Sequence, residues 1–138
     1  MSHYLLDTNV ISELTRHSPA LQVVRFLNEQ DDLWLSSIVI YELEYGLRLL
    51  PKGRRRSRLS EMQSGILSAY ENRILPLDTR GAEWAAHFRA ESRRIGRPLD
   101  LGDALIAGTA KAHALSLATR NVTDFENLDI DVINPWDV

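Results

Sequence analysis

Residues 4–9 read YLLDTN, and this stretch decides how the rest of the chain is interpreted. Three apolar residues followed at once by three polar ones are typical of a short buried strand whose carboxyl end leads into a capped helix. Apolar residues at helical spacing then predict helices over 10–16 and 19–28, and the run WLSS predicts a second strand over 34–37. The chain thus begins as a strand, two helices and a strand.

The same alternation continues to the end of the chain. Helices are expected over 38–50, 59–70, 79–95 (or 81–95) and 101–113, strands over 74–77, 116–119 and 132–133, and a basic loop over 52–58. Strands that alternate with helices predict a parallel sheet, because right-handed crossovers place helices on both of its faces. The expected fold class is α/β, a three-layer α/β/α arrangement around a central parallel sheet of four to five strands.

The composition is that of an ordinary globular domain. The 138 residues are 44% hydrophobic and 25% charged, and we expect a single domain over 1–138. The lack of cysteine excludes disulfides and thiolate metal sites, and it is typical of a reducing compartment. The sequence shows neither a signal-peptide pattern nor a run of about 20 apolar residues, so we expect a cytoplasmic protein with no membrane span.

Four carboxylates stand out by their positions relative to these elements. Asp7 and Asp124 follow predicted strands, Glu42 lies in the first turns of the helix after the second strand, and Asp103 opens an apolar helix that should be buried. In open parallel sheets, ligands bind at the carboxyl ends of the strands. We therefore expect these four acids to converge in one site.

Two of the acids could be explained by local structure alone. Asp7 could cap the first helix, although Asn9 or Thr8 could do so instead, and a charge beside a buried strand is costly unless something neutralises it. For Asp124, a turn residue is an equally good interpretation. The case for both depends on the cluster as a whole.

The other two acids have competing neighbours on their own helices. Glu44 has Arg48 four residues later, in the orientation that favours an exposed ion pair, whereas Glu42 has no such partner. Asp100 can cap the following helix, which leaves Asp103 as a second carboxylate in its first turn, where the helix dipole alone would favour it. We favour functional roles for Glu42 and Asp103.

Carboxylates gathered in one pocket repel one another. The repulsion is about 3 to 4 kcal/mol for a pair ~5 Å apart at an effective dielectric constant near 20, so a cation must offset it. Oxygen ligands, with no cysteine and with four histidines scattered along the chain, favour Mg²⁺, or Mn²⁺ in its place, over zinc. Magnesium held in this way suits phosphodiester hydrolysis by an activated water.

Four separated motifs carry a family resemblance. They are LDTN over 6–9, SIVIYEL over 37–43 with Gly46, the segment 99–107 around Asp103, and TRN over 119–121 with Asp124-Phe125. Together, in this order and over nearly the whole chain, they resemble PIN-domain proteins, specifically the VapC and FitB toxins of type II toxin–antitoxin systems. Any one of these motifs alone would be a weak signal.

The resemblance implies both site residues and an activity. Asp7, Glu42, Asp103 and Asp124 would form the family's acidic metal-binding quartet, with Asn9 and Thr119 as polar supports. Asp7 and Asp103 would be the direct ligands of a metal-dependent endoribonuclease that cleaves single-stranded or looped RNA. The resemblance also implies a homodimer, inhibition by a cognate antitoxin and a higher toxin–antitoxin assembly.

Basic residues are confined to local runs, since the formal net charge is −3. The run KGRRRSR over 52–58 includes Arg54, Arg55 and Arg56, which we expect to guide RNA by phosphate contacts. A solvated loop with no binding role is the plain alternative. The salt dependence of RNA binding distinguishes the two interpretations.

An antitoxin would lay an extended or helical tail over apolar helices near the acidic groove. Tyr41, Tyr45 and Leu49 are candidates for that surface. Apolar residues at this helical spacing are more often part of the core, which is the competing interpretation.

Two other functions remain open. A haloacid-dehalogenase-like phosphatase also has an aspartate after its first strand, but that family has a second acid two residues later, where this chain has Asn9. A catalytically silent PIN-like module could use the acidic pocket only to bind a basic peptide. Dinucleotide and P-loop nucleotide binding are disfavoured because neither glycine motif occurs.

Overall fold

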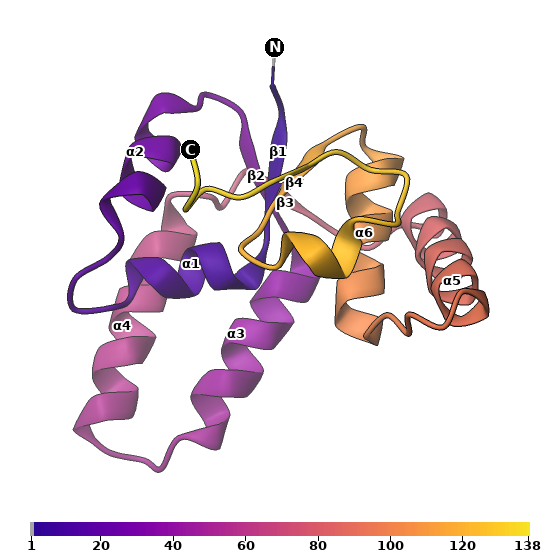
Figure 1. Cartoon of the computed structure of the whole chain (residues 1–138). Coiled ribbons are helices and arrows are strands. Elements are labelled where there is room, and N and C mark those ends of the chain that lie inside the picture. The colour runs from indigo at the N-terminus through magenta and orange to yellow at the C-terminus, as the bar shows by residue number, and fades with distance from the viewer. Residues whose placement is uncertain (1) are drawn as a thin grey trace.

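A parallel five-stranded sheet forms the centre of the molecule (Figure 1). The structure is a computed structural model, and it describes residues 2–138. The strands are β1 (Tyr4–Leu6), β2 (Leu33–Ser36), β3 (Ile74–Leu75), β4 (Ser116–Ala118) and β5 (Val132–Ile133). The helices are α1 (Thr8–Leu14), α2 (Leu21–Glu29), α3 (Ser37–Leu49), α4 (Arg54–Ser68), α5 (Thr79–Arg94) and α6 (Leu101–Ala112), with a 3-10 turn η1 (Val122–Phe125).

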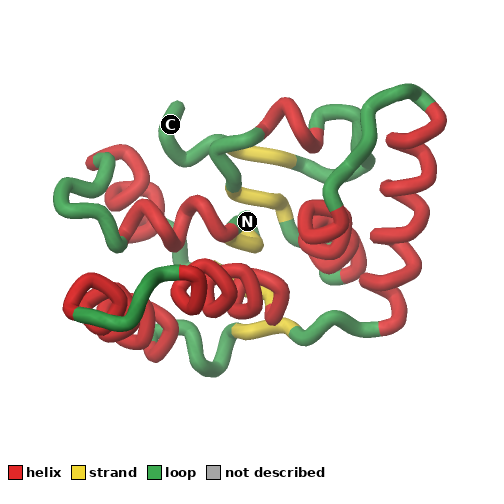
Figure 2. Tube along the Cα trace, turned by 90° about the horizontal axis from the view of Figure 1, so that it is seen from below, coloured by secondary structure: helices red, strands yellow, loops and turns green. Residues whose placement is uncertain are grey.

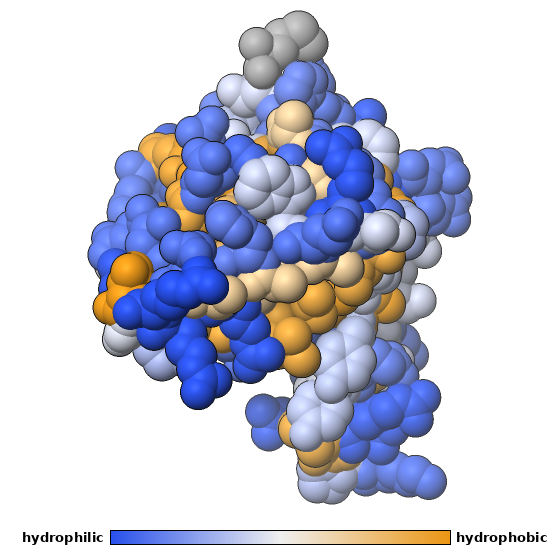
Figure 3. All heavy atoms as spheres, turned by 90° about the vertical axis from the view of Figure 1, so that its right-hand side faces the viewer, coloured by the Kyte–Doolittle hydropathy of each residue, from blue (hydrophilic) through white to orange (hydrophobic). Residues whose placement is uncertain are grey.

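Helices cover both faces of this sheet, which confirms the expected α/β/α arrangement. Helices α1 to α4 lie on one side, and α6 lies on the other side with α5 packed against it (Figures 1 and 2). The outer surface on the α5 side is mainly hydrophilic, with smaller hydrophobic patches (Figure 3). No helix within residues 2–138 is both long and apolar enough to cross a membrane.

The order of the strands places β1 at the centre of the sheet. The order is β3-β2-β1-β4-β5, and all neighbouring strands are parallel. The chain first runs outward from β1 to β3 and then returns to the other side of β1, where Leu6 is in register with Ala118 of β4. Such a reversal opens a crevice at the carboxyl ends of the two strands, where ligands of open α/β sheets bind. The sheet therefore locates a site just beyond Leu6.

The core explains why YLL lacks the alternation of an exposed strand. Leu5 and Leu6 of β1, Leu35 of β2 and Leu117 of β4 are all fully buried. Strands covered on both faces by helices are continuously apolar. The polar residues that follow each strand, such as Asp7 after β1, therefore lie where the chain leaves the core.

The clearest difference from the sequence-based prediction concerns the basic segment. Residues 52–58 were expected to form a loop, but α4 begins at Arg54, so Arg54, Arg55 and Arg56 lie in its first turn. Arginine is a good helix former, and no breaker follows Gly53, so the helix extends toward the preceding turn. Arginines at a helix N-terminus face the unfavourable end of the dipole.

The other boundaries differ by a few residues. β2 ends at Ser36, whose Oγ accepts a hydrogen bond from the backbone N–H of Val39 at 3.3 Å and thus caps α3. Likewise α1 begins earlier than expected, at Thr8, and β3 is shorter than the predicted strand over 74–77. The caps Asp7 and Ser36 and the position of β3 at the edge of the sheet explain differences of this size.

Tyr41, Tyr45 and Leu49 form an exposed apolar stripe on α3. Their side chains are 64%, 55% and 67% exposed, so the interpretation of these residues as core is wrong. The two tyrosine rings stack on each other at 5.9 Å between centroids. The stripe is therefore exposed to contact by another molecule.

Helices α5 and α6 approach each other closely at Gly108. A Cβ atom there would lie 2.3 Å from the carbonyl oxygen of Gly81 and 2.7 Å from the backbone nitrogen of Ala85. Both distances are far below van der Waals contact, so only glycine permits this packing. Because α6 also carries Asp103, the same contact fixes where that carboxylate lies.

We predict that Gly108→Ala lowers the free energy of unfolding by about 1–3 kcal/mol, because the added methyl group must separate two packed backbones. The matched control is Gly46→Ala in α3, where a Cβ atom would meet nothing within 4 Å. That substitution should raise stability by up to about 1 kcal/mol through helix propensity. Urea denaturation of both variants measures the difference, and equal effects would contradict the packing argument.

Candidate active site

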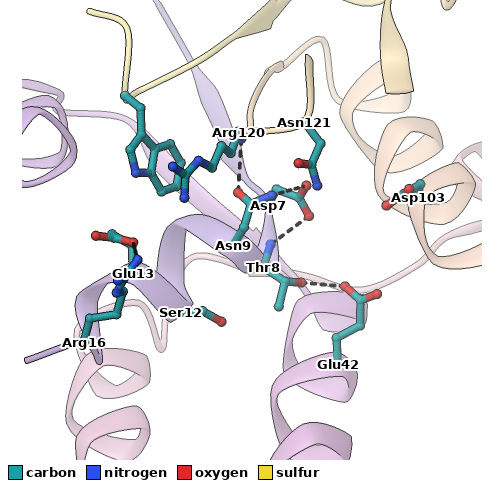
Figure 4. A pocket seen from close by; sticks show the side chains of 11 residues that line it. Asp7, Thr8, Asn9, Ser12, Glu13, Arg16, Glu42, Asp103, Arg120 and Asn121 are labelled. Carbon is teal, nitrogen blue, oxygen red and sulfur yellow. Dashed lines mark hydrogen bonds and ion pairs between the residues drawn. The ribbon is translucent and has the colours of Figure 1, made fainter. Parts of the chain in front are cut away.

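A cavity of about 530 Å³ opens at the carboxyl ends of the central strands (Figure 4). Asp7 lies at its centre, with Glu42 and Asp103 on one side and Arg16 and Arg120 on the other. The three acids come from the end of β1, from α3 and from α6. The fold thus brings together groups that are far apart in the sequence.

Asp7 is both a helix cap and a buried acid of the cavity. It is 5% exposed and accepts a hydrogen bond from the backbone N–H of Thr8 at 2.7 Å. Its second oxygen accepts a hydrogen bond from Oγ1 of Thr119 at 2.7 Å. Burial raises the pKa of Asp7, while these two hydrogen bonds oppose the rise. The capping role therefore does not exclude a functional one.

Asn9 and Thr119 form a polar network around Asp7. The side-chain amide of Asn9 donates to Oγ1 of Thr119 at 3.2 Å and lies 3.4 Å from Asp7. In turn, Oδ1 of Asn9 accepts from the backbone N–H of Arg120 at 3.2 Å, and Oγ1 of Thr119 accepts from that of Asn121 at 3.1 Å. This network joins the end of β1 to the loop after β4 and holds the Asp7 carboxylate in one orientation.

Glu42 is brought to Asp7 through Thr8. Oγ1 of Thr8 donates a hydrogen bond to Glu42, so one residue links the first turn of α1 to α3 (Figure 4). The opposite oxygen of Glu42 lies against Gly102, where a Cβ atom would come within 2.8 Å of it. Burial raises the pKa of Glu42, and Asp7 and Asp100 raise it further, against the Thr8 hydrogen bond.

Asp103 carries the largest electrostatic perturbation in this site. Burial, followed by repulsion from Asp7, Asp100, Asp124 and Glu42, raises its pKa to about 7. It lies in the first turn of α6, as expected, and Asp100 caps that helix by accepting from the backbone N–H of Gly102 at 3.1 Å. Repulsion by four other carboxylates is relieved either by protonation of Asp103 or by a nearby positive charge.

Asp124 lies at the edge of the same cluster. It is exposed in η1 and borders, with Asp100 and Asp103, a second cavity of about 320 Å³. Its charge raises the pKa of both Asp7 and Asp103, so it is close enough to act on them. The structure therefore brings all four predicted acids into one region and adds Asp100 as a fifth.

Sequence reasoning missed three contributors to this site. Thr8 and Asp100 were considered only as helix caps, and Gly102 was not considered at all. Each has a role within its own helix that the sequence shows, and a further contact or charge effect on an acid from another element that it does not show. A signal existed only for Gly102, as a helix-weakening glycine placed between two acids in the first turn of a helix.

The remaining predicted residues divide between the site and its surroundings. The exposed pair of Glu44 and Arg48 is confirmed, with 2.8 Å between Nε of Arg48 and Oε1 of Glu44. The arginines at 54–56 do not line the acidic cavity. They lie at the start of α4, near the tip of the α3–α4 hairpin, away from the carboxyl end of β1 (Figure 1).

The donor set fits a hard divalent ion. Within residues 2–138, no three acidic or histidine side chains already stand close enough to hold an ion jointly. Mg²⁺ does not need such a set, because it is commonly bound through one or two carboxylates and keeps several waters. Burial and four neighbouring negative charges raise the pKa of Asp103, and the same negative charges attract a cation.

Comparison with known proteins gives the class to which this fold and site belong. Residues 4–130 match the family model of the PIN domain. Toxin FitB of Neisseria gonorrhoeae is 40% identical over 135 residues, covering 96% of this chain and 97% of FitB. VapC ribonuclease Y4jK of Sinorhizobium fredii is 38% identical over 136 residues, with coverage of 96% and 97%.

Solved structures agree with the sequence matches. The crystal structure of FitAcB from Neisseria gonorrhoeae superposes with a TM-score of 0.88 at 39% identity, covering 98% of this chain and 99% of that chain. The chain therefore belongs to the PIN-domain family, in the group of the VapC and FitB toxins.

We predict that, in EDTA, Asp103→Asn stabilises the protein above neutral pH. Because the pKa of Asp103 is raised to about 7 in the folded state, its contribution to the free energy of unfolding falls as pH rises from about 4 to 7. The variant should be more stable than the wild type by about 1–2 kcal/mol at pH 8, after discounting for solvent screening, and the difference should vanish near pH 4.

Chemical denaturation across this pH range measures the effect. Asp31→Asn, at an exposed position before β2, is the control for removing one negative charge elsewhere. A stability difference for Asp103→Asn that does not change with pH would contradict the electrostatic account of this cluster.

Proposed function

We propose that this protein is a magnesium-dependent endoribonuclease and the toxin component of a type II toxin–antitoxin system. The observation that carries the proposal is the meeting of Asp7, Glu42, Asp103 and Asp124 in one cavity region, where burial and the neighbouring negative charges raise the pKa of Asp103 to about 7. The names of the relatives support it, since one is a ribonuclease and another a toxin.

The chain's own residues have separate tasks in this proposal. Asp7 and Asp103 would hold the ion directly, and Glu42 and Asp124 would hold its waters or orient the attacking water. Thr119 and Asn9 would keep Asp7 in place, as their hydrogen bonds to it do in the structure. Bound magnesium would lower the pKa of a water and stabilise charge on the phosphate oxygens. Mn²⁺ should substitute, because it also prefers oxygen ligands.

Two other functions were considered. Membership of the PIN-domain family removes the support for a haloacid-dehalogenase-like phosphatase. A catalytically silent module is distinguished from a nuclease only by activity. The proposal therefore requires a cleavage experiment.

We expect the purified protein to cleave single-stranded RNA with Mg²⁺ and to lose the activity in EDTA. Asp7→Asn should lower kcat by at least about 100-fold, because the amide cannot hold the ion as a carboxylate does, while the fold is retained. Gel analysis of a structured and an unstructured RNA measures cleavage, and circular dichroism checks folding. Full activity of Asp7→Asn would contradict the proposal, and an inactive wild type would favour the silent module.

The basic residues at the start of α4 are proposed to guide the RNA toward the cavity. Substitution of Arg54, Arg55 and Arg56 by alanine should weaken RNA binding and reduce the slope of log K against log salt by up to about 0.7 per lost phosphate contact. Fluorescence anisotropy over a series of KCl concentrations measures the slope. An unchanged slope would show that these arginines are only a solvated surface.

Regulation by a cognate antitoxin and assembly as a homodimer complete the proposal. The support for an antitoxin partner is the name of FitB as a toxin and the existence of a FitAB structure bound to a DNA fragment, whereas the homodimer is proposed from the family resemblance alone. On this chain, the exposed stripe of Tyr41, Tyr45 and Leu49 is the candidate contact surface. Its stacked rings and exposed leucine offer the apolar area that a helical or extended partner segment would cover.

A further inference from the structure

The side of the cavity opposite Glu42 and Asp103 carries two arginines and a tryptophan. Arg16, Arg120 and Trp136 line it together with Glu13, and Figure 4 shows the side chains of Arg16 and Arg120 across the cavity from Glu42 and Asp103. The guanidinium of Arg120 lies over the ring of Trp136, 5.0 Å from its centroid. The cavity thus has an acidic side around Glu42 and Asp103 and an opposite side on which Arg120 carries a positive charge and Arg16 is paired with Glu13.

The two arginines differ in whether an acidic side chain neutralises their charge. Arg16 lies 3.4 Å from Glu13, whose carboxylate also accepts a hydrogen bond from the backbone N–H of Ala20 at 2.8 Å. Arg120, by contrast, has no acidic partner among the ion pairs of residues 2–138. Its positive charge is therefore not neutralised within the described part of the chain.

Arg120 is nevertheless held in place. Its backbone N–H donates to Oδ1 of Asn9, which ties the start of its side chain to the network around Asp7. Stacking on Trp136 fixes the far end, since guanidinium groups pack favourably on aromatic faces. A fixed cation loses little conformational entropy when it binds an anion, so this arrangement suits recognition of an external anion.

A polyanionic substrate also needs such a cation. RNA that approaches the carboxylates is repelled by them, and a divalent ion bound there would neutralise only part of the negative charge. A guanidinium binds a phosphate through two parallel hydrogen bonds. We propose that Arg120 binds an RNA phosphate next to the one that is cleaved, and that Trp136 is the positioning residue that holds the guanidinium in place. The inference rests on the proposed RNA substrate.

The test uses a short fluorescein-labelled single-stranded RNA of mixed sequence and the whole protein. Binding is measured by anisotropy in EDTA over a series of KCl concentrations, and kcat and KM are measured separately with Mg²⁺. Arg120→Ala should weaken binding about tenfold, reduce the salt slope by about 0.7, and raise KM with kcat unchanged. Arg120→Lys should retain the slope, because it keeps the charge, but should bind more weakly than the wild type.

A double-mutant cycle tests the role of Trp136. Trp136→Ala should weaken binding, but Arg120→Ala with Trp136→Ala should bind no more weakly than Arg120→Ala alone, because the tryptophan acts through the arginine. Trp136→Phe should restore most of the affinity. Arg25→Ala, at an exposed position of α2 outside the cavity, is the control for loss of one positive charge.

The outcomes separate this inference from the proposed function. Arginine-dependent RNA binding by a protein that does not cleave RNA would support the inference and overturn the nuclease proposal. Cleavage by the wild type with unchanged KM and salt slope in Arg120→Ala would overturn the inference alone, and it would leave this side of the cavity to a protein partner. Additive effects in the cycle, with a lower Tm for Trp136→Ala, would show that the tryptophan only anchors the C-terminal segment.

Discussion

Repulsion among carboxylates at the carboxyl end of β1 is the constraint on which the rest of the structure depends. Five acids from four segments act on one another there, and the pKa of Asp103 is raised by burial first and then by the other four. Groups of like charge do not gather in a folded protein without compensation, because each costs stability. The hydrogen bonds from Thr119 and Thr8 offset part of that cost at Asp7 and Glu42. The cluster is thus destabilising by itself and is understandable as a site for a cation.

The surrounding fold is arranged so that this cluster can form. Gly102 leaves room for the carboxylate of Glu42, and Gly108 lets α6 pack against α5 at backbone distance. Glycine lowers the stability of a helix relative to alanine. At these two positions, however, any side chain would push α6, which carries Asp103, away from its neighbours. The position of Asp103 therefore depends on the two glycines, Gly102 and Gly108.

Charge separation within the cavity matters as much as the acids themselves. Asp7 lies between an acidic side formed by α3 and α6 and a cationic side that includes Arg120. Asn9 links the two sides, because its side chain contacts Asp7 and accepts a hydrogen bond from the backbone N–H of Arg120. In the proposed complex, one phosphate would lie near the acids and the next near the guanidinium.

The sequence by itself determined the α/β class and the parallel sheet, and its four motifs indicated the acids proposed for the site. The class and the sheet could be predicted because strand burial and helix periodicity are local properties. Only the tertiary structure decided that Thr8 contacts Glu42, that Gly102 lies beneath that carboxylate, and that Arg120 stacks on Trp136. It also showed that Tyr41 and Tyr45 are exposed and that the arginines at 54–56 begin a helix. These features depend on which surfaces meet when distant segments pack, and neither spacing nor residue type contains that information.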